Sequence, residues 1–355
     1  MNNSTEINLE LAKLTNGGRI YLPVGKYNIV EPIVVDTPCI KIEGEVWNYS
    51  ADPNGVFESK YGTKLRHTRL DIPAIIMSRE NVIGGNIIKD IGIQGDIVGM
   101  DTRGMFNYEN PAASAGICFC SKRVDQAEVS KVSCCGLAAA VVVTGTAEID
   151  ACTFEKINAD GCCIGIYFAP RASYYARFCH CIVADTPSYG FFANGEKAYV
   201  HNLDISDTYF VRNGGAFPKD NPYPKAAVCF YKVSKCAIRN NVFDAAGTFW
   251  YYEPTATHNS ERQPSTTAVP ALYLEGNNNR IIGNSFANSS ADSIVINGDG
   301  NIIMNNIVDN DIVINGNGNI ISNNVFTSEN SKVILSAVSK DNEFIGIPES
   351  RIIRR

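Results

Sequence analysis

The sequence has no long apolar run and few basic residues. No stretch of about 18 consecutive apolar residues occurs, so no membrane-spanning helix is expected. The 31 lysines and arginines are outnumbered by 37 aspartates and glutamates, and the net charge of −6 argues against a nucleic-acid-binding surface. Residues 1–18 contain no apolar segment of the kind found in secretory signals. We therefore expect a cytoplasmic protein with neither a nucleic-acid nor a membrane partner.

The sequence also lacks the paired Cys-x-x-Cys spacing of zinc sites, although it has 12 cysteines. Cys179, His180 and Cys181 are consecutive, and neighbours on a strand point to opposite faces, so they form a poor ligand set. Most of the other cysteines lie in apolar, strand-like phrases, where a free cysteine acts as a small apolar filler. We expect unpaired thiols, no metal site and no cofactor, as in a reducing compartment.

What the sequence does contain is one phrase repeated three times, over residues 271–286, 293–308 and 311–326. Each copy has an alternating apolar run, a Gly/Asn turn, a second β-branched run, a single Asn and a short third run. The single asparagines recur at intervals of about 20 residues, at Asn284, Asn305 and Asn323. Strand-and-turn repeats of this length cannot bury their apolar side alone, so they must stack on one another.

This pattern predicts an all-β solenoid, a parallel β-helix in which residues far apart in the sequence stack in columns. The single Asn suits a tight bend in the left-handed conformation, and stacked amides can hydrogen-bond from coil to coil. A sandwich or barrel with Asn-Gly hairpins is the alternative, but hairpin loops would not repeat one phrase in the same phase. Because a solenoid core grows in one dimension, we expect a single domain over residues 1–355.

Three segments are too long to be turns between coils. We expect long loops at residues 45–70, 211–225 and 244–270, with the last two overhanging the first strand of each coil. Edge cover or an oligomer contact is the alternative role for these loops. Residues 1–18 are expected to form an N-terminal cap with a short helix, which would cover the open edge of the first coil. The most regular coils are predicted over residues 271–345.

The N-terminal phrases resemble the opening of a known protein superfamily. Gly17 to Tyr27 read Gly-Gly-Arg-Ile-Tyr-Leu-Pro-Val-Gly-Lys-Tyr, and Ile40-Lys-Ile-Glu-Gly and Ile88-Lys-Asp-Ile-Gly-Ile-Gln-Gly follow. These phrases are similar to those of pectate-lyase-like proteins, which include polysaccharide lyases, glycoside hydrolases, sugar epimerases and phage tailspikes. The resemblance implies a single-stranded right-handed parallel β-helix, and it says little about the reaction.

A narrower resemblance is to inulin fructotransferases and difructose-anhydride hydrolases. It rests on Gly161-Cys-Cys-Ile164 in mid-helix, a long loop, and the phrase Gly276-Asn-Asn-Asn-Arg-Ile-Ile-Gly-Asn284. That family carries a carboxylate at the position after the Ile, where this chain has Gly165. The resemblance therefore implies the fold and a homotrimer, and no catalytic residue is carried over from it.

The alternation also predicts which side chains face outward on the first strand of each coil. Aromatic and amide side chains form a strip there, which we expect to bind sugar rings, at Tyr167, Phe192, Asn194, Tyr231 and Tyr273. Trp250, in the 244–270 loop, is expected to join this substrate-binding surface. An aromatic ladder that only stabilises stacked strands is the alternative.

Carboxylates near this strip are the candidate catalytic residues. Cleavage of a glycosidic bond uses two carboxylates, about 5 Å apart for retention or about 6.5–9.5 Å apart for inversion. Glu275 lies on the strip, and Asp244 and Glu253 begin the long loop before it, one or two coil spacings away. A carboxylate among aromatic rings should have a raised pKa, as a general acid requires. Carboxylates at other coil ends are second choices, each with a solvated turn as its alternative role: Asp160, Asp185, Asp207 and Asp220.

These observations favour a carbohydrate-active enzyme that cleaves or rearranges a glycosidic bond in an oligo- or polysaccharide. A glycoside hydrolase is the preferred hypothesis, with a polysaccharide lyase close to it. A fructan lyase or intramolecular fructosyl transferase of the inulin fructotransferase type is one alternative. A non-catalytic glycan-binding β-helix, such as a phage tail or adhesion module, is the other.

Overall fold

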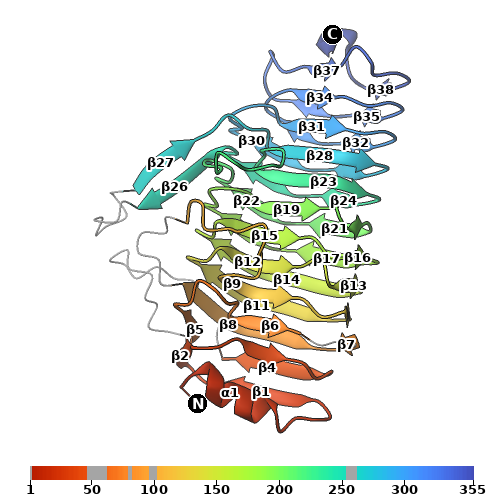
Figure 1. Ribbon diagram of the computed structural model, residues 1–355. Helices are drawn as coiled ribbons and strands as arrows, with labels where there is room; N and C mark the ends of the chain where they lie inside the picture. Colours follow the sequence, from red (N-terminus) through yellow and green to blue (C-terminus); the bar gives the residue numbers. More distant parts are fainter. Residues whose placement is uncertain (1, 46–61, 79–81, 96–101, 253–261) are drawn as a thin grey trace.

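A computed structural model describes residues 2–45, 62–78, 82–95, 102–252 and 262–355. They form a right-handed parallel β-helix whose coils stack from the N-terminus to the C-terminus (Figure 1). Helix α1, Ser4–Leu11, begins where the Asn3 side chain accepts a hydrogen bond from the Glu6 amide, and it buries Ile7 and Leu11 against the first coil. The predicted solenoid and its capping helix are confirmed. None of the described helices has the length and apolarity to cross a membrane.

Each regular coil has three walls. The first wall is a parallel sheet of β3 (Ile33–Val35), β6 (Ile75–Met77), β9 (Ala115–Phe119), β12 (Ala139–Val143), β15 (Ile164–Phe168), β19 (Phe191–Asn194), β23 (Val228–Ser234), β28 (Leu272–Asn277), β31 (Ile294–Asn297), β34 (Ile312–Ile314), β37 (Val333–Leu335) and β39 (Ile352–Arg354). The second wall consists of β1 (Gly18–Leu22), β4 (Ile40–Gly44), β17 (Ala176–Cys179), β21 (Leu203–Ser206), β24 (Ala237–Arg239), β29 (Arg280–Ile282), β32 (Ile302–Met304), β35 (Ile320–Ser322) and β38 (Glu343–Ile345).

The third wall continues the hydrogen-bonded sheet of the second wall around a corner. It consists of β2 (Gly25–Ile29), β5 (Thr63–His67), β18 (Ile182–Ala184), β22 (Tyr209–Val211), β25 (Val242–Asp244), β30 (Ser285–Ala287), β33 (Ile307–Val308) and β36 (Val325–Phe326). Three long strands run through both walls: β8 (Ile87–Gly95), β11 (Glu128–Cys135) and β14 (Cys152–Asp160). Short strands between the first and second walls form a small sheet of β7 (Val82–Gly84), β10 (Arg123–Asp125), β13 (Glu148–Asp150), β16 (Ala172–Ser173) and β20 (Tyr199–Val200).

The core is built from the inward side chains of each strand. Aromatic rings stack from coil to coil, with ring centroids 4.2 Å apart for Phe154 and Phe178 and 4.6 Å apart for Phe243 and Phe286. In the regular coils the first-wall residues are fully buried and paired in register: Leu272, Leu274, Ile294, Ile296, Ile312 and Ile314. Successive coils therefore bury the same positions of the repeat, as the alternation predicts.

The corner between the second and third walls is held by a column of buried asparagines. Its members hydrogen-bond from coil to coil at 2.9–3.1 Å, and they are Asn241, Asn284, Asn306 and Asn324. The residue before each of them has a positive φ, and these are Asn240, Gly283, Asn305 and Asn323. The prediction that one asparagine serves both as left-handed bend and as stacked amide was wrong. The left-handed asparagines are exposed, so the inward-pointing neighbour supplies the stacked amide.

The predicted loops contain more regular structure than expected. Strand β5 lies inside the predicted 45–70 loop, whose residues 46–61 are outside the described part of the chain. An antiparallel hairpin of β26 (Thr248–Tyr252) and β27 (Arg262–Thr266) lies inside the predicted 244–270 loop. Figure 1 shows this hairpin projecting from the side of the coils. Residues 212–227 connect β22 to β23 without a strand, as predicted for that segment.

Glu43 is the centre of a charge cluster on the second wall of the N-terminal coils. Its carboxylate lies 2.8 Å from the Nζ atom of Lys89 and 2.9 Å from both Lys41 Nζ and Arg19 Nη2. Hydrogen bonds from Lys89 and then Lys41 lower the pKa of Glu43 to about 2. The cluster therefore favours the folded state only while Glu43 is ionised.

We expect E43Q to lower the free energy of unfolding at neutral pH by about 1–2 kcal/mol, since the cations lose their shared partner and are themselves partly exposed. Because folding lowers the pKa of Glu43, its contribution is present above the ordinary value of 4.5 and is lost as the pH falls towards 2. Denaturant unfolding of both proteins across this pH range measures the difference. A difference that stays constant down to pH 2 would contradict the assignment.

Candidate functional site

The outer face of the first wall carries a second apolar cluster, separate from the core. Strand register places Val142, Tyr167, Phe192, Cys229 and Tyr273 side by side on five successive strands. This is the row that the alternation predicts to face outward. The row therefore lies where it was predicted. Whether a ligand can contact it depends on the segments that cover it.

Two connecting segments cover the middle of this row. The ring of Phe106 lies 5.0 Å from that of Tyr167, and the ring of Tyr223 lies 4.9 Å from that of Phe192. Tyr108 packs on both, 6.4 Å from Tyr167 and 6.3 Å from Phe192. As a result, 5% of Tyr167 and 0% of Phe192 is exposed. These two rings, predicted to bind a sugar, are instead buried by the protein's own loops. The 211–225 loop overhangs the first wall as predicted, but it closes this part of the surface.

The remaining edge of the cluster is a line of tyrosine, amide and carboxylate side chains, here called the Tyr/Glu strip, in which all members except Asn194 are at least partly exposed. Its members are Asn194, Glu196, Tyr223, Tyr231, Tyr273, Glu275 and Asn297. They come from β19, β23, β28 and β31, from the turn after β19 and from the segment before β23. Four of the predicted site residues therefore lie together: Asn194, Tyr231, Tyr273 and Glu275.

At one end of the strip, Tyr273 joins a carboxylate to two amides. Its hydroxyl donates a hydrogen bond to Glu275 Oε2 at 2.9 Å and accepts one from Asn297 Nδ2 at 2.6 Å. Asn315 Nδ2 in turn donates to Asn297 Oδ1 at 2.7 Å. Burial, followed by the hydrogen bond to Glu275, raises the pKa of Tyr273. Tyr273 therefore stays protonated and keeps its proton directed at Glu275.

At the other end, Glu196 and Lys232 flank the ring of Tyr231. Lys232 Nζ lies 3.3 Å from Glu196 Oε1 and 4.7 Å from the centre of the Tyr231 ring. Burial raises the pKa of Tyr167 and of Tyr223, and the nearby amide of Asn194 partly offsets this rise. The Asn194 Oδ1 atom accepts a hydrogen bond from the Glu196 backbone N–H at 3.0 Å. The strip thus has a positively charged group beside one of its two carboxylates.

The two carboxylates of the strip lie on opposite sides of β23. Because β19 pairs with β23 and β23 with β28, strands β19 and β28 are two strand spacings apart, about 9–10 Å along the wall, and Glu196 lies in the turn beyond the end of β19. Glu196 was not predicted from the sequence, although this residue lies two positions after Asn194 and continues the same alternation.

The other predicted catalytic residues are not part of this strip. Asp244 ends β25 on the third wall, where its Oδ1 accepts a hydrogen bond from Asn288 Nδ2 at 2.9 Å. A residue on the third wall cannot pair with Glu275 on the outer face of the first wall, so the predicted Asp244–Glu275 pair is corrected here. Glu253 lies outside the described residues. Trp250, on β26, is 36% exposed and lies by the third wall rather than over the strip.

Trp250 instead lies beside a second group of carboxylates, on the third wall. Its backbone N–H donates to Asp185 Oδ1 at 3.3 Å, and Asp185 forms a two-pronged ion pair with Arg212, both distances being 2.7 Å. Asp185, with Asp160 and Asp244 nearby, raises the pKa of Arg212. The charge of Asp185 is therefore already neutralised, which suits an anchor for the hairpin better than a general acid. Among the described residues, no three His, Cys, Asp or Glu side chains are placed to hold a metal ion.

No protein-family model and no curated protein matches this sequence. Solved structures do resemble it. The DFA-IIIase of Arthrobacter chlorophenolicus A6 in complex with GF2 superposes with a TM-score of 0.70 at 15% identity, over 98% of this chain and 90% of that one. The same enzyme in complex with DFA-III gives a TM-score of 0.65 at 17% identity, over 99% and 92% of the two chains.

A viral protein shares the architecture less closely. Geobacillus virus E2 ORF18 gives a TM-score of 0.50 at 14% identity, and it matches 97% of this chain but 62% of its own length. At such low identities the likeness extends to the path of the backbone and not to the side chains of a site. This chain therefore shares the DFA-IIIase fold along almost its whole length.

Proposed function

We propose that this protein is a carbohydrate-active enzyme that acts on a glycosidic bond of an oligosaccharide at the Tyr/Glu strip. The observation that carries the proposal is the linked group of Glu275, Tyr273 and Asn297 on the outer face of the first wall. A carboxylate beside an accessible tyrosine edge has both a group that exchanges protons and a flat surface for a sugar ring. The fold neighbours in complex with GF2 and DFA-III support a saccharide ligand.

Five residues of the strip would take part in binding or in the reaction. Tyr231 and Tyr273 support the sugar ring, and Asn297 binds a hydroxyl group at its rim. Oε2 of Glu275 accepts the hydrogen bond from the Tyr273 hydroxyl, so the other oxygen exchanges a proton with the glycosidic oxygen or the attacking group. Glu196, held by Lys232, is the second carboxylate. A homotrimer is also proposed, and light scattering of the purified protein tests it.

Hydrolysis and intramolecular transfer are the two reactions that fit this site. Hydrolysis of a glycosidic bond uses two carboxylates, for which Glu275 and Glu196 are the candidates in this strip. The two DFA-IIIase neighbours equally favour a rearrangement of fructose units. A lyase is a third reaction class, in which the bond is broken by elimination and no water is added.

Incubation in water enriched in the heavy oxygen isotope separates these reactions. We expect turnover of GF2, of DFA-III or of one member of a panel of neutral and acidic oligosaccharides. Mass spectrometry of the products detects it. Hydrolysis places one heavy oxygen in the product at the moment of cleavage, whereas transfer and elimination place none. The reaction is quenched within the first turnovers, because a free sugar slowly exchanges its anomeric oxygen with water. Absence of any product across the whole panel would contradict an enzymatic role.

A non-catalytic glycan-binding protein is the second candidate. The burial of Tyr167 and Phe192 favours it over an enzyme with an extended substrate platform, since it removes two of the five predicted aromatic side chains from contact with a substrate. This candidate predicts glycan binding without a product, and binding that is unchanged when either carboxylate of the strip becomes an amide.

A further inference from the structure

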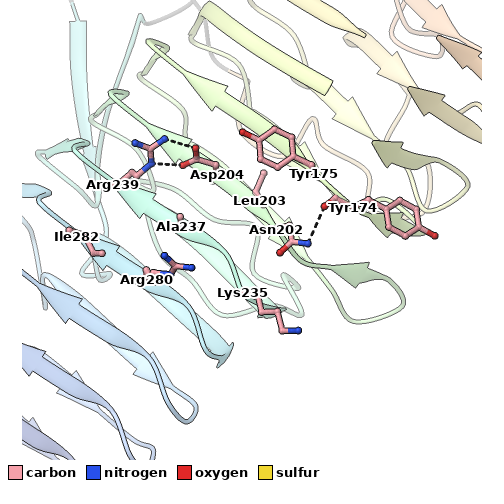
Figure 2. A pocket seen from close by; sticks show the side chains of 10 residues that line it. All are labelled: Tyr174, Tyr175, Asn202, Leu203, Asp204, Lys235, Ala237, Arg239, Arg280 and Ile282. Carbon is pink, nitrogen blue, oxygen red and sulfur yellow. Dashed lines mark hydrogen bonds and ion pairs between the residues drawn. The ribbon is translucent and has the colours of Figure 1, made fainter. Parts of the chain in front are cut away.

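A pocket of about 360 Å³ opens on the outer face of the second wall, on a different side of the β-helix from the Tyr/Glu strip (Figure 2). Tyr174 and Tyr175 come from the turn before β17, Asp204 from β21 and Arg239 from β24. Arg280 from β29 and Lys235 from the turn before β24 complete its charged lining. None of these residues has a part in the proposed reaction.

The pocket exists because a small residue lies between two large ones. Strand register places Asp204, Ala237 and Arg280 in one row across β21, β24 and β29. The methyl group of Ala237 leaves an opening between its two neighbours, and Ile282 continues the floor on β29. Figure 2 shows the Arg239–Asp204 pair on one side of this floor, Tyr175 near it and Arg280 opposite.

The charges around the pocket do not cancel. Arg239 is paired with Asp204 through two hydrogen bonds of 2.9 and 2.6 Å, so these two groups neutralise each other. Arg280 and Lys235 have no ion pair within the part of the chain that the structure describes. The pocket is therefore locally positive on a protein whose net charge is −6. Such a site attracts an anion against the overall charge of the molecule.

Tyrosines add a preference for a ring. Tyr174 and Tyr175 are each 44% exposed, and the carbonyl of Tyr174 accepts a hydrogen bond from Asn202 Nδ2 at 3.1 Å. The guanidinium of Arg123 packs over the Tyr174 ring at 5.6 Å. Exposed tyrosine rings suit the C–H face of a sugar, while their hydroxyls reach its polar rim. The pocket thus has cationic side chains that can bind an anion and tyrosine rings that can pack on a pyranose ring.

We propose that this pocket binds a sugar unit that carries a negative charge, either a ring carboxylate or a sulfate ester. Arg280 and Lys235 bind the anionic group, Tyr175 packs on the sugar ring, and the Asp204–Arg239 pair accepts and donates hydrogen bonds at its hydroxyls. The pocket has the size of a small-ligand site. This site is independent of the proposed reaction, and it would hold an acidic glycan on a second face of the protein.

Calorimetric titration of the full chain tests the proposal with five probes. They are a galacturonate trisaccharide, a sulfated galactose trisaccharide, the neutral galactose trisaccharide, sodium sulfate and a single-stranded DNA hexamer. We expect one or both acidic trisaccharides to bind, and binding to weaken as salt is added. R280A and K235A should each weaken binding by about tenfold, the loss of one hydrogen bond to a charged group. A237L should abolish binding by filling the floor.

Two controls make the result specific. K340A removes an exposed lysine near the C-terminus, far along the chain from the pocket, and should leave affinity unchanged. Y231A, which removes a ring of the Tyr/Glu strip and none of the pocket, should also leave it unchanged, so that binding in the pocket and binding at the strip can be told apart. Equal binding of the neutral trisaccharide, sulfate binding as tight as that of the acidic trisaccharides, preferential binding of DNA, or full affinity in both R280A and K235A would each overturn the proposal. Thermal unfolding of each variant confirms that it is folded.

Discussion

Replacing Glu275 with glutamine is expected to lower the turnover of the protein's glycan substrate by about 10²–10⁴-fold, the usual contribution of a positioned acid or base. The amide keeps the size of the carboxylate and can still accept the hydrogen bond that Tyr273 donates at 2.9 Å. Binding of the substrate should therefore change little, and the loss should fall on kcat. Steady-state kinetics of the wild type and E275Q, with the affinity of E275Q measured by titration, gives both quantities.

Asp244 provides the matched control for this experiment. It was predicted from the sequence to pair with Glu275, but it lies on the third wall and bonds to Asn288. D244N makes the same chemical change outside the strip, so we expect it to retain nearly full activity. E196Q should lower kcat as E275Q does if Glu196 is the second carboxylate. Full turnover by E275Q, or loss of turnover by D244N alone, would reject the strip as the active site.

Tyr273 extends the same argument, because it holds the carboxylate in place. Burial raises its pKa, so its hydroxyl remains a donor to Glu275 at neutral pH. The pH dependence of kcat should consequently show no step caused by the tyrosine. The Tyr/Glu strip thus has a fixed hydrogen-bond donor beside Glu275.

The fold could be predicted from the sequence because the solenoid repeats one local rule. Leu272 and Leu274 alternate with polar neighbours, and the same alternation returns at Ile294 and Ile296 one coil later. A stacked repeat turns this one-dimensional pattern into columns, so inward and outward positions follow directly. No long-range information beyond the repeat is needed for this step.

The site was harder to predict, because alternation says which way a side chain points and not what covers it. Tyr167 and Phe192 do point outward, yet Phe106 and Tyr108 from a segment without any repeat fold onto them. That segment has no periodic signal that places it against a particular wall. Glu196 was not predicted for a related reason. It lies in the turn after β19, where strand alternation no longer fixes the direction of a side chain.

Asn306 allows the largest test of the architecture itself. It is fully buried, and its Oδ1 accepts hydrogen bonds from the Asn284 amide N–H at 2.9 Å and from Asn284 Nδ2 at 3.0 Å. Its own Nδ2 donates to the Ile281 carbonyl at 3.0 Å and to Asn324 Oδ1 at 2.9 Å. Truncation to alanine would leave several buried polar groups without partners, at about 1–3 kcal/mol for each one that water cannot reach.

We therefore expect N306A to lower the free energy of unfolding by about 3–5 kcal/mol, measured by urea denaturation, since a buried network loses its central member. The adjacent Asn305 is the control, because it is exposed and has a φ of 56°. N305G keeps that left-handed conformation without strain, so its effect should stay within about 1 kcal/mol. Because each coil contacts only its neighbours, hydrogen exchange in N306A should rise first in the coils next to residue 306. A loss below 1 kcal/mol in N306A, or an equal loss in both variants, would mean that the bend and not the amide column holds this corner together.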